Sequence, residues 1–336
     1  MRIDVINPWG RDAPADWRAG PPVPGAPGHA PINYWAWAAA TGGQFHQDPA
    51  TVTTDADAIV QLLRWRSAAN LRALKQLKAC GLPVFVSWKE SGQEQIAEQL
   101  RWPWRRSALR AVLRLADGAI ATTEPAIQHY QEYGLPAERV HFIPTPYPFD
   151  VPGWDFARPL AERSGIVVGS RQFDVPSRRH AEALQLAGTI ARAASCAVTV
   201  FNLDGEAGRR RVLKLVGTVS ELRWIERRLP YPEFLQELAR HRLVIQRDAG
   251  WVPGQIAGDA LLCGLVNIGG NGTTQRLAFP ATAEPEAAEA TLTETAIELL
   301  RDDAAFNEAV KTSHQNAEAA GLSYRSGRAR LAALLK

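Results

Sequence analysis

Short apolar runs alternate with stretches of helical periodicity along the first half of the chain. Continuous apolar runs that follow Gly or Pro are typical of buried strands in a parallel sheet, and the stretches between them predict the connecting helices. The predicted strands cover residues 3–6, 84–88, 118–121 and 140–143, and the predicted helices cover residues 57–78, 105–115 and 125–133. This alternation predicts an α/β domain.

The alternation stops in a proline-rich segment, residues 144–159, and then restarts. The second half has predicted strands at 166–169, 197–201, 222–225, 243–246 and 265–268, and predicted helices at 178–194, 207–217, 232–240, 254–263, 293–319 and 323–335. We therefore expect two Rossmann-like domains with doubly wound parallel sheets, at residues 1–159 and 160–322. A closing helix over residues 323–336 is expected to pack back on the first domain.

Composition places the chain among globular proteins, because 46% of its 336 residues are hydrophobic and 22% are charged. No apolar run approaches the roughly 20 residues that span a bilayer, and the N-terminus carries no signal-peptide pattern. The three cysteines are widely spaced and show no metal-binding pattern. A net charge of +3 argues against nucleic-acid binding through bulk electrostatics. We expect a cytoplasmic protein without a nucleic-acid partner.

Three segments occur in a recognisable order and spacing. They are residues 116–120 with 133–144, residues 166–169 with the arginines that follow, and the Gly-Asp-Ala-Leu-Leu-Cys-Gly-Leu-Val segment at 258–266. Together they resemble the retaining glycosyltransferases of family 4, which have the two-domain GT-B architecture. The resemblance implies a nucleoside-diphosphate-sugar donor, a retaining transfer, and no bound metal or other cofactor. The acceptor is open and can be a glycan, a lipid-linked molecule or a protein.

A glycine-rich loop follows the last predicted strand and precedes a short helix. Glycines let the backbone approach a phosphate closely, and a helix N-terminus offers unpaired N–H groups. The predicted diphosphate-binding residues of this loop are Gly270, Asn271, Gly272, Thr273 and Thr274. The alternative is a tight turn with a threonine helix cap, which would use the same residues.

Arginines after the strand at 166–169 form a second predicted phosphate site. The resemblance implies a Gly-Arg pair and a further Lys or Arg that contact the donor diphosphate, and the candidates here are Arg171, Arg178 and Arg179. Fixed cations stabilise a diphosphate as it leaves, so arginine suits this role. The alternative for Arg178 or Arg179 is a solvated position on the following helix.

The acidic pattern of the donor site is incomplete. The family usually has two glutamates separated by seven positions, one facing the donor sugar and one the ribose. Asp259 occupies the second position and retains a carboxylate, but Trp251 occupies the first. An indole is a hydrogen-bond donor only, so Trp251 would stack on a sugar or base. Either Asp248 and Arg247 supply the polar contacts to the sugar, or transferase activity has been lost.

The first domain offers three candidate catalytic residues. Lys89 and Glu90 follow the strand at 84–88, where the family often has a histidine, and His46 lies beyond a Gly-Gly pair and is predicted to face the acceptor. A lone histidine or surface glutamate is more often structural, which is the alternative for each of them.

Residues 101–116 predict a basic amphipathic helix that begins Arg-Trp-Pro-Trp-Arg-Arg. A helix of this kind binds an anionic membrane surface, which predicts a peripheral contact at the inner face of the membrane. The alternative is a domain helix whose apolar face, with Leu109, Val112 and Leu113, packs on the sheet.

Two further functions stay open. A nucleotide-sugar epimerase on the same two-domain plan would need a carboxylate pair near the sugar, and we identify none in the sequence. A catalytically inactive GT-B protein, kept as a binding or assembly subunit, is suggested by Trp251 in the expected glutamate position.

Overall fold

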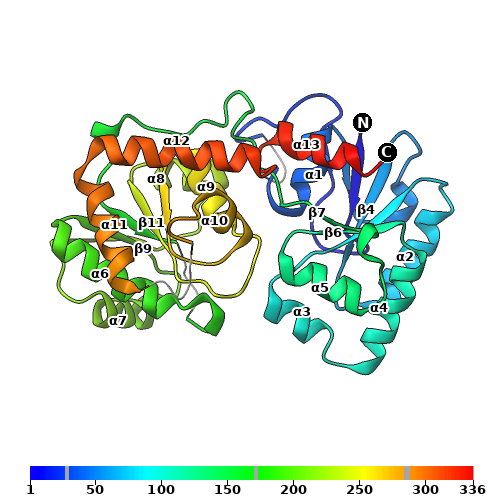
Figure 1. Cartoon of the computed structure of the whole chain (residues 1–336), viewed down its shortest axis with the longest axis horizontal. Coiled ribbons are helices and arrows are strands. Elements are labelled where there is room, and N and C mark those ends of the chain that lie inside the picture. The colour runs from blue at the N-terminus through cyan, green and yellow to red at the C-terminus, as the bar shows by residue number, and fades with distance from the viewer. Residues whose placement is uncertain (27–29, 170–172, 284–287, 336) are drawn as a thin grey trace. The chain divides into compact units, whose positions relative to one another are not determined.

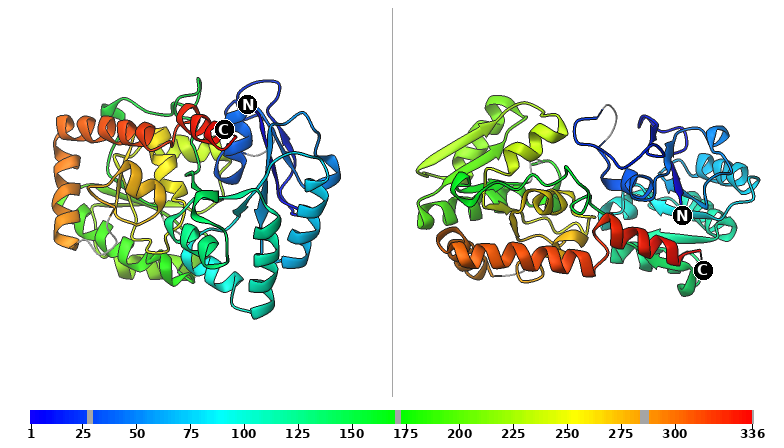
Figure 2. Two further views of the ribbon diagram at one scale, coloured as in Figure 1. Left: turned by 45° about the vertical axis from the view of Figure 1, so that its right-hand side comes forward. Right: turned by 90° about the horizontal axis from the view of Figure 1, so that it is seen from above.

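In a computed structural model of the protein, the chain divides into two compact units (Figures 1 and 2). The structure describes residues 1–26, 30–169, 173–283 and 288–335. Unit 1 consists of Met1–Pro152, Trp251–Pro253 and Ala319–Lys336, and unit 2 of Gly153–Gly250 and Gly254–Glu318. The first boundary between units thus falls after Pro152, whereas the sequence prediction placed the domain boundary at residue 159.

Unit 1 contains a seven-stranded sheet in the order β2-β3-β1-β4-β5-β6-β7, in which only β2 is antiparallel to its neighbour. The strands are β1 (Ile3–Ile6), β2 (Ala15–Asp16), β3 (Gln44–His46), β4 (Ala58–Leu63), β5 (Val84–Trp88), β6 (Gly118–Ala121) and β7 (Val140–Phe142). The helices are α1 (Ala36–Thr41), α2 (Ser67–Lys78), α3 (Gln93–Gln99), α4 (Pro103–Leu115), α5 (Glu124–Glu132) and α13 (Tyr324–Ala333). One apolar cluster joins the sheet to α1 and α13, and another joins it to α2, α4 and α5.

One element of unit 1 contradicts the sequence prediction. Residues 57–78 were predicted as a single helix, but Ala58–Leu63 form strand β4 in the middle of the sheet and only Ser67–Lys78 are helical. Every residue of β4 is buried, because β1 and β5 pair with it and helices cover both faces. A fully buried strand lacks the alternation of polar and apolar positions that marks a half-exposed strand, so it is easily read as part of a buried helix.

Unit 2 contains a five-stranded parallel sheet in the order β10-β9-β8-β11-β12. Its strands are β8 (Ile166–Val168), β9 (Ala197–Phe201), β10 (Glu221–Ile225), β11 (Leu243–Ile245) and β12 (Val266–Ile268). Its helices are α6 (His180–Ala194), α7 (Gly205–Val216), α8 (Tyr231–Leu238), α9 (Gln255–Cys263), α10 (Thr273–Ala278), α11 (Glu289–Arg301) and α12 (Asp303–Ala319). The predicted alternation of strands and helices from residue 166 onward is confirmed.

The end of the chain differs from the prediction in one respect. The expected helix over 293–319 is two helices, because Asp302 leaves the helical conformation between α11 and α12. Its carboxylate accepts hydrogen bonds from the backbone N–H groups of Ala304 and Ala305 at 2.8 and 3.0 Å, which caps α12. Helix α13 then packs within unit 1, where Asp150 accepts hydrogen bonds from the N–H groups of Tyr324 and Arg325.

Candidate functional site

The strand order shows where each sheet offers a ligand site. In an open parallel sheet a ligand binds beyond the carboxyl ends of the strands, at the point where the strand order reverses. In unit 2 the order reverses between β8 and β11, and in unit 1 it reverses between β1 and β4. The loops that follow these strands therefore contain the candidate site of each unit.

A buried ion pair lies at the reversal point of unit 2. Arg178, at the end of the short helix before α6, donates from Nη1 to the Oδ2 of Asp248, which follows β11. The other carboxylate oxygen of Asp248 accepts the N–H of Gly250 at 2.7 Å, and the side chain of Asp248 is only 2% exposed. The Arg178 side chain is 29% exposed, so this pair presents its cation rather than its anion to solvent.

The glycine-rich loop lies beside this ion pair. The N–H of Asn271 donates to the backbone oxygen of Asp248 at 2.9 Å, which fixes the loop after β12 against the loop after β11. Gly269 has a φ of +82°, and a Cβ there would lie 2.2 Å from the backbone oxygen of Gln246, so the site requires glycine. Helix α10 begins at Thr273 as predicted, with Gly272 at its N-cap.

The remaining residues predicted to bind the diphosphate differ in burial and in their contacts. Thr273 and Thr274 are buried, at 2% and 1% exposure, as is Asn271 at 2%. Arg179 precedes α6 in the left-handed region, at φ +44°, and its Nη1 lies 3.9 Å from Glu182 Oε2. Arg171 falls outside the described residues. Their roles in donor binding stay predictions.

The residues predicted for the ribose and sugar also lie in different environments. Asp259 is inside α9, is 1% exposed, and accepts a hydrogen bond from Tyr231 Oη of α8 at 2.5 Å. Burial raises the pKa of Asp259 to about 7, against the lowering effect of its hydrogen bonds. Arg247 is 12% exposed and its Nε lies 3.9 Å from Glu182 Oε2. Trp251 is partly buried, with a strained φ of +49°.

The reversal point of unit 1 holds a second ion pair, between Lys89 and Asp12. Lys89, directly after β5, donates from Nζ to Asp12 Oδ2 at 2.6 Å, and Tyr34 Oη donates to Asp12 Oδ1 at 3.0 Å. The side-chain amide of Asn7, the residue after β1, donates to the same carboxylate. Burial alone would raise the pKa of Asp12, but its bonds to Lys89, Tyr34 and Asn7 outweigh burial and lower it.

The sequence prediction named Lys89 in this cluster but missed its three partners. Asp12 and Tyr34 lie in or just beyond the Pro- and Gly-rich stretch after β1, which has no periodicity to place them. Asn7 had a usable signal, because it directly follows a predicted strand. Glu90, the other candidate beside Lys89, has an exposed side chain.

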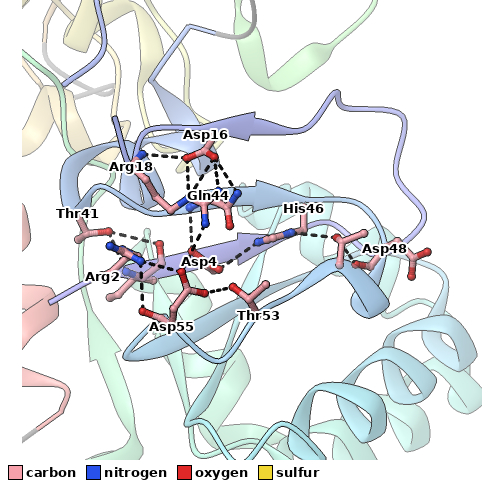
Figure 3. A network of polar contacts seen from close by, with 12 residues as sticks. Arg2, Asp4, Asp16, Arg18, Thr41, Gln44, His46, Asp48, Thr53 and Asp55 are labelled. Atoms are coloured by element: carbon pink, nitrogen blue, oxygen red, sulfur yellow. Dashed lines mark hydrogen bonds and ion pairs between the residues drawn. The ribbon is translucent and has the colours of Figure 1, made fainter. Parts of the chain in front are cut away.

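His46 lies at the end of β3 within a network of polar contacts on β1 and β3 (Figure 3). It is 6% exposed, and its Nε2 lies 3.1 Å from Asp4 Oδ2 while its Nδ1 lies 3.0 Å from Thr51 Oγ1. Asp4 in turn accepts the N–H of Gln44 at 2.8 Å. Both ring nitrogens are thus engaged inside unit 1, and a catalytic role for His46 stays a prediction.

The described part of the chain contains neither a metal-binding cluster nor a membrane-spanning helix. Among these residues no three or more His, Cys, Asp or Glu side chains gather in a way that could hold a metal ion. None of the helices described has both the length and the apolarity needed to cross a bilayer.

Sequence comparison finds known proteins that match part of this chain. Residues 2–150 match the model of glycosyltransferase family 4. A lipid-A-disaccharide synthase of Myxococcus xanthus (strain DK1622) is 32% identical over 99 residues. That match covers 29% of this chain and 22% of the relative, so the chain spans about a fifth of the curated relative's length.

Solved structures resemble the fold over most of the chain. The Anabaena protein Alr3699/HepE, in complex with UDP, has a TM-score of 0.60 at 13% identity, with 84% of this chain and 79% of that chain covered. A UDP-forming trehalose-phosphate synthase from Burkholderia xenovorans has a TM-score of 0.57 at 13% identity, with 84% and 74% covered. These likenesses confirm the predicted GT-B fold of two Rossmann-like domains.

Proposed function

We propose that this chain, a protein of the GT-B fold that resembles the family 4 glycosyltransferases, transfers a sugar from a nucleoside-diphosphate sugar to an acceptor. One observation carries the proposal: the reversal point of unit 2 presents the guanidinium of Arg178, held by the buried Asp248, beside the glycine loop after β12. A fixed cation beside closely approaching backbone suits a diphosphate. The structures of HepE with UDP and with UDP-glucose support UDP-sugar as the first donor to test.

The chemical role of the site is to stabilise the departing diphosphate. Negative charge develops on the diphosphate as the glycosidic bond to the sugar breaks, and a preoriented cation lowers the free energy of that state. Arg178 is preoriented because Asp248 fixes it and Gly250 fixes Asp248. We propose that arginine supplies this charge without a metal ion. Retention of configuration is proposed from the resemblance alone.

The remaining proposed donor contacts are those to the ribose and to the sugar. Asp259 would bind the ribose only if its carboxylate leaves Tyr231, because it is buried against α8. Arg247 is the candidate for the sugar within unit 2, and a sugar contact by Trp251, which belongs to unit 1, stays a prediction. Asp248 acts through Arg178 in this structure, so it is a positioning residue.

A panel of nucleoside diphosphates and their sugar conjugates, read by thermal shift and by release of free UDP, tests the proposal. We expect at least one nucleotide to raise the Tm, since ligand at 100 times its Kd stabilises the folded state by about 2.7 kcal/mol. Arg178→Ala should weaken that nucleotide about tenfold or more, because it removes a charged hydrogen-bond donor. The matched control is Arg223→Ala on the edge strand β10, where Arg223 is 44% exposed and paired with Glu221; it should leave the affinity unchanged.

The outcomes separate the competing functions. If no nucleotide stabilises the protein, both the transferase and the epimerase are excluded. Stabilisation without hydrolysis or transfer of the sugar indicates an inactive binding subunit. Conversion of one nucleotide sugar into another indicates the epimerase.

A contact with an anionic membrane through residues 101–116 is proposed in a narrower form than the sequence suggested. The apolar face of α4 is not available, because Leu109, Val112 and Leu113 are buried in the core of unit 1. The large apolar side chains that are exposed in this segment are Trp102 and Trp104, at 41% and 62%, whose nearly parallel rings lie 5.0 Å apart, and Leu115, at 41%. Cosedimentation with vesicles containing anionic lipid tests it: a Trp102→Ser, Trp104→Ser double variant should lose binding, and unchanged binding would exclude this pair.

A further inference from the structure

The loop from Asn7 to Asp12 forms a small closed structure at the reversal point of unit 1. It begins where β1 ends and closes on itself, because the Asn7 side-chain amide donates to the Asp12 carboxylate. The same carboxylate binds Lys89 and Tyr34, whose ring centroid lies 4.7 Å from Lys89 Nζ. Residues from three distant parts of the chain therefore converge on one carboxylate.

One atom of this cluster is left without a hydrogen bond. Asn7 is 0% exposed, and among the described residues none donates to its Oδ1. Buried amide oxygens are normally paired, so the unpaired Oδ1 calls for a buried water, because a side chain with 0% exposure does not reach a ligand directly. Gly10 leaves room for the amide, because a Cβ at Gly10 would lie 2.1 Å from Asn7 Nδ2.

The tip of the loop carries an exposed tryptophan in an unfavourable backbone conformation. The N–H of Gly10 donates to the backbone oxygen of Asn7 at 2.9 Å, which closes a tight turn with Pro8 and Trp9 at its centre. Trp9 has a φ of +50°, at a turn position that normally takes Gly or Asn. Its ring is 38% exposed, so burial in the core does not explain why tryptophan is there. Strain of this kind is found at ligand-binding sites.

The geometry points to a binding site for a sugar in this loop: Trp9 stacks on the ring of a carbohydrate acceptor, and Asp12 and Lys89 bind its hydroxyl groups. A sugar hydroxyl both donates and accepts, so it can donate to Asp12 and accept from Lys89. Aromatic rings provide apolar area for the C–H face of a sugar. This inference rests on the proposed transferase function, and it specifies the acceptor as a carbohydrate.

The charge of the cluster favours a neutral sugar over a phosphate or carboxylate. Lys89 is already paired with Asp12 at 2.6 Å, so an anion would meet the Asp12 carboxylate at close range. Both side chains are mostly buried, at 12% for Lys89 and 17% for Asp12, which leaves a small exposed polar edge. Such an edge suits one or two hydroxyl groups.

Saturation-transfer NMR of the full chain with methyl glycosides of glucose, galactose, mannose and N-acetylglucosamine, each with and without UDP, tests the inference. We expect at least one glycoside to bind. Trp9→Gly should weaken it about tenfold or more while the Tm stays the same or rises, because glycine removes the backbone strain. Asp12→Asn should weaken the same glycoside. The control is Ser195→Gly, which relieves a φ of +53° at the C-cap of α6 and should leave glycoside binding unchanged.

The two proposals fail separately in this experiment. Thermal stabilisation by UDP reports the donor site alone, whatever the glycosides do. If no glycoside binds the wild type with or without UDP, or if Trp9→Gly binds as tightly as the wild type, the carbohydrate site is wrong even where UDP binds. If glycosides bind in the loop and no nucleotide stabilises the protein, the site stands as a carbohydrate site and the transferase does not.

Discussion

The two reversal points of this molecule each contain a carboxylate–cation pair, but only the pair of unit 2 buries its two members unequally. In unit 2 the Asp248 carboxylate is 2% exposed and Arg178 is 29% exposed. In unit 1 Asp12 and Lys89 are similarly covered, at 17% and 12%. The same pairing of residue types on the same kind of sheet edge therefore presents a net cation in one unit and a balanced pair in the other.

This difference assigns different ligands to the two edges. A carboxylate that is fully buried and hydrogen-bonded cannot contact a ligand, so Asp248 serves only to orient Arg178, and the exposed guanidinium suits a diphosphate. A balanced pair with both partners at a small exposed edge repels anions and cations alike and suits hydroxyl groups. Substituting one member of each pair tests whether burial determines what each pair contributes to stability and binding.

Removing the buried anion of unit 2 should have the largest effect. Asp248→Ala leaves Arg178 without its partner and removes the bond to Gly250, so we expect a loss of about 3 kcal/mol in the free energy of unfolding, measured with urea. We also expect weaker binding of UDP, because Arg178 is no longer fixed.

The exposed pair between Asp16 and Arg18 provides the control. Asp16 lies 2.7 Å from Arg18, and the two side chains are 44% and 40% exposed. Asp16→Ala should cost at most about 1 kcal/mol, since exposed ion pairs contribute little. If Asp248→Ala and Asp16→Ala lose the same free energy of unfolding, burial does not make the Asp248–Arg178 pair more stabilising than an exposed pair.

A second buried carboxylate of unit 2 sharpens the comparison, because its hydrogen-bond partners are neutral. Burial raises the pKa of Asp259 to about 7 in the folded protein, above the 3.8 of an exposed aspartate. The folded state then holds a proton that the unfolded state releases, so the contribution of Asp259 to stability is greatest below pH 3.8 and falls as the pH rises towards 7. Between pH 5 and pH 7 the wild type should lose about 2 kcal/mol relative to Asp259→Asn, measured by urea unfolding at both pH values.

The result also bears on the ribose role of Asp259. If the difference between the two proteins does not change with pH, the carboxylate is ionised in the folded state and its burial is relieved by some other contact. In that case Asp259 would be available as an anion to bind ribose hydroxyls at neutral pH.

The sequence predicted the sheet of unit 2 and its candidate site better than those of unit 1, for physical reasons. In unit 2, Asp248 and the glycine-rich loop follow strands β11 and β12 within a few residues, so locating these strands locates the residues. In unit 1 the aspartate of the site lies in a proline-rich loop, and Tyr34 reaches it from a short helix (Asn33–Trp35) after that loop. Periodicity cannot place such residues.

The wrong prediction of a helix over 57–78 has a related cause. Strand β4 is completely buried, so its sequence shows an apolar run joined to the amphipathic pattern of α2. Because β4 flanks β1 at the reversal point, missing it also concealed where the site of unit 1 lies. The strand assignment of β4 and the location of the unit 1 site both depend on pairing between distant strands, which the local sequence does not show.

The smallest expected effect concerns the balanced pair of unit 1. Lys89→Met removes the ammonium group that lowers the pKa of Asp12, and we expect a loss of about 1–2 kcal/mol in the free energy of unfolding at pH 7. The matched control is Lys78→Met: Lys78 pairs with Asp117 at 2.7 Å, but the side chains are 36% and 39% exposed, so about 0.5 kcal/mol or less is expected.

The pH dependence of that loss identifies its origin. Because the pKa of Asp12 in the folded protein lies below 3.8, the contribution of the pair is complete above that value and disappears as the pH falls through the folded pKa. The difference in stability between the wild type and Lys89→Met should therefore be constant from pH 7 to pH 5 and shrink below pH 3.8. A difference that persists unchanged at pH 3 would mean that Lys89 stabilises unit 1 through its aliphatic chain and its position over Tyr34 rather than through the charge of Asp12. The charge of Lys89 would then not balance the Asp12 carboxylate, and the argument for a neutral ligand at this edge would lose its basis.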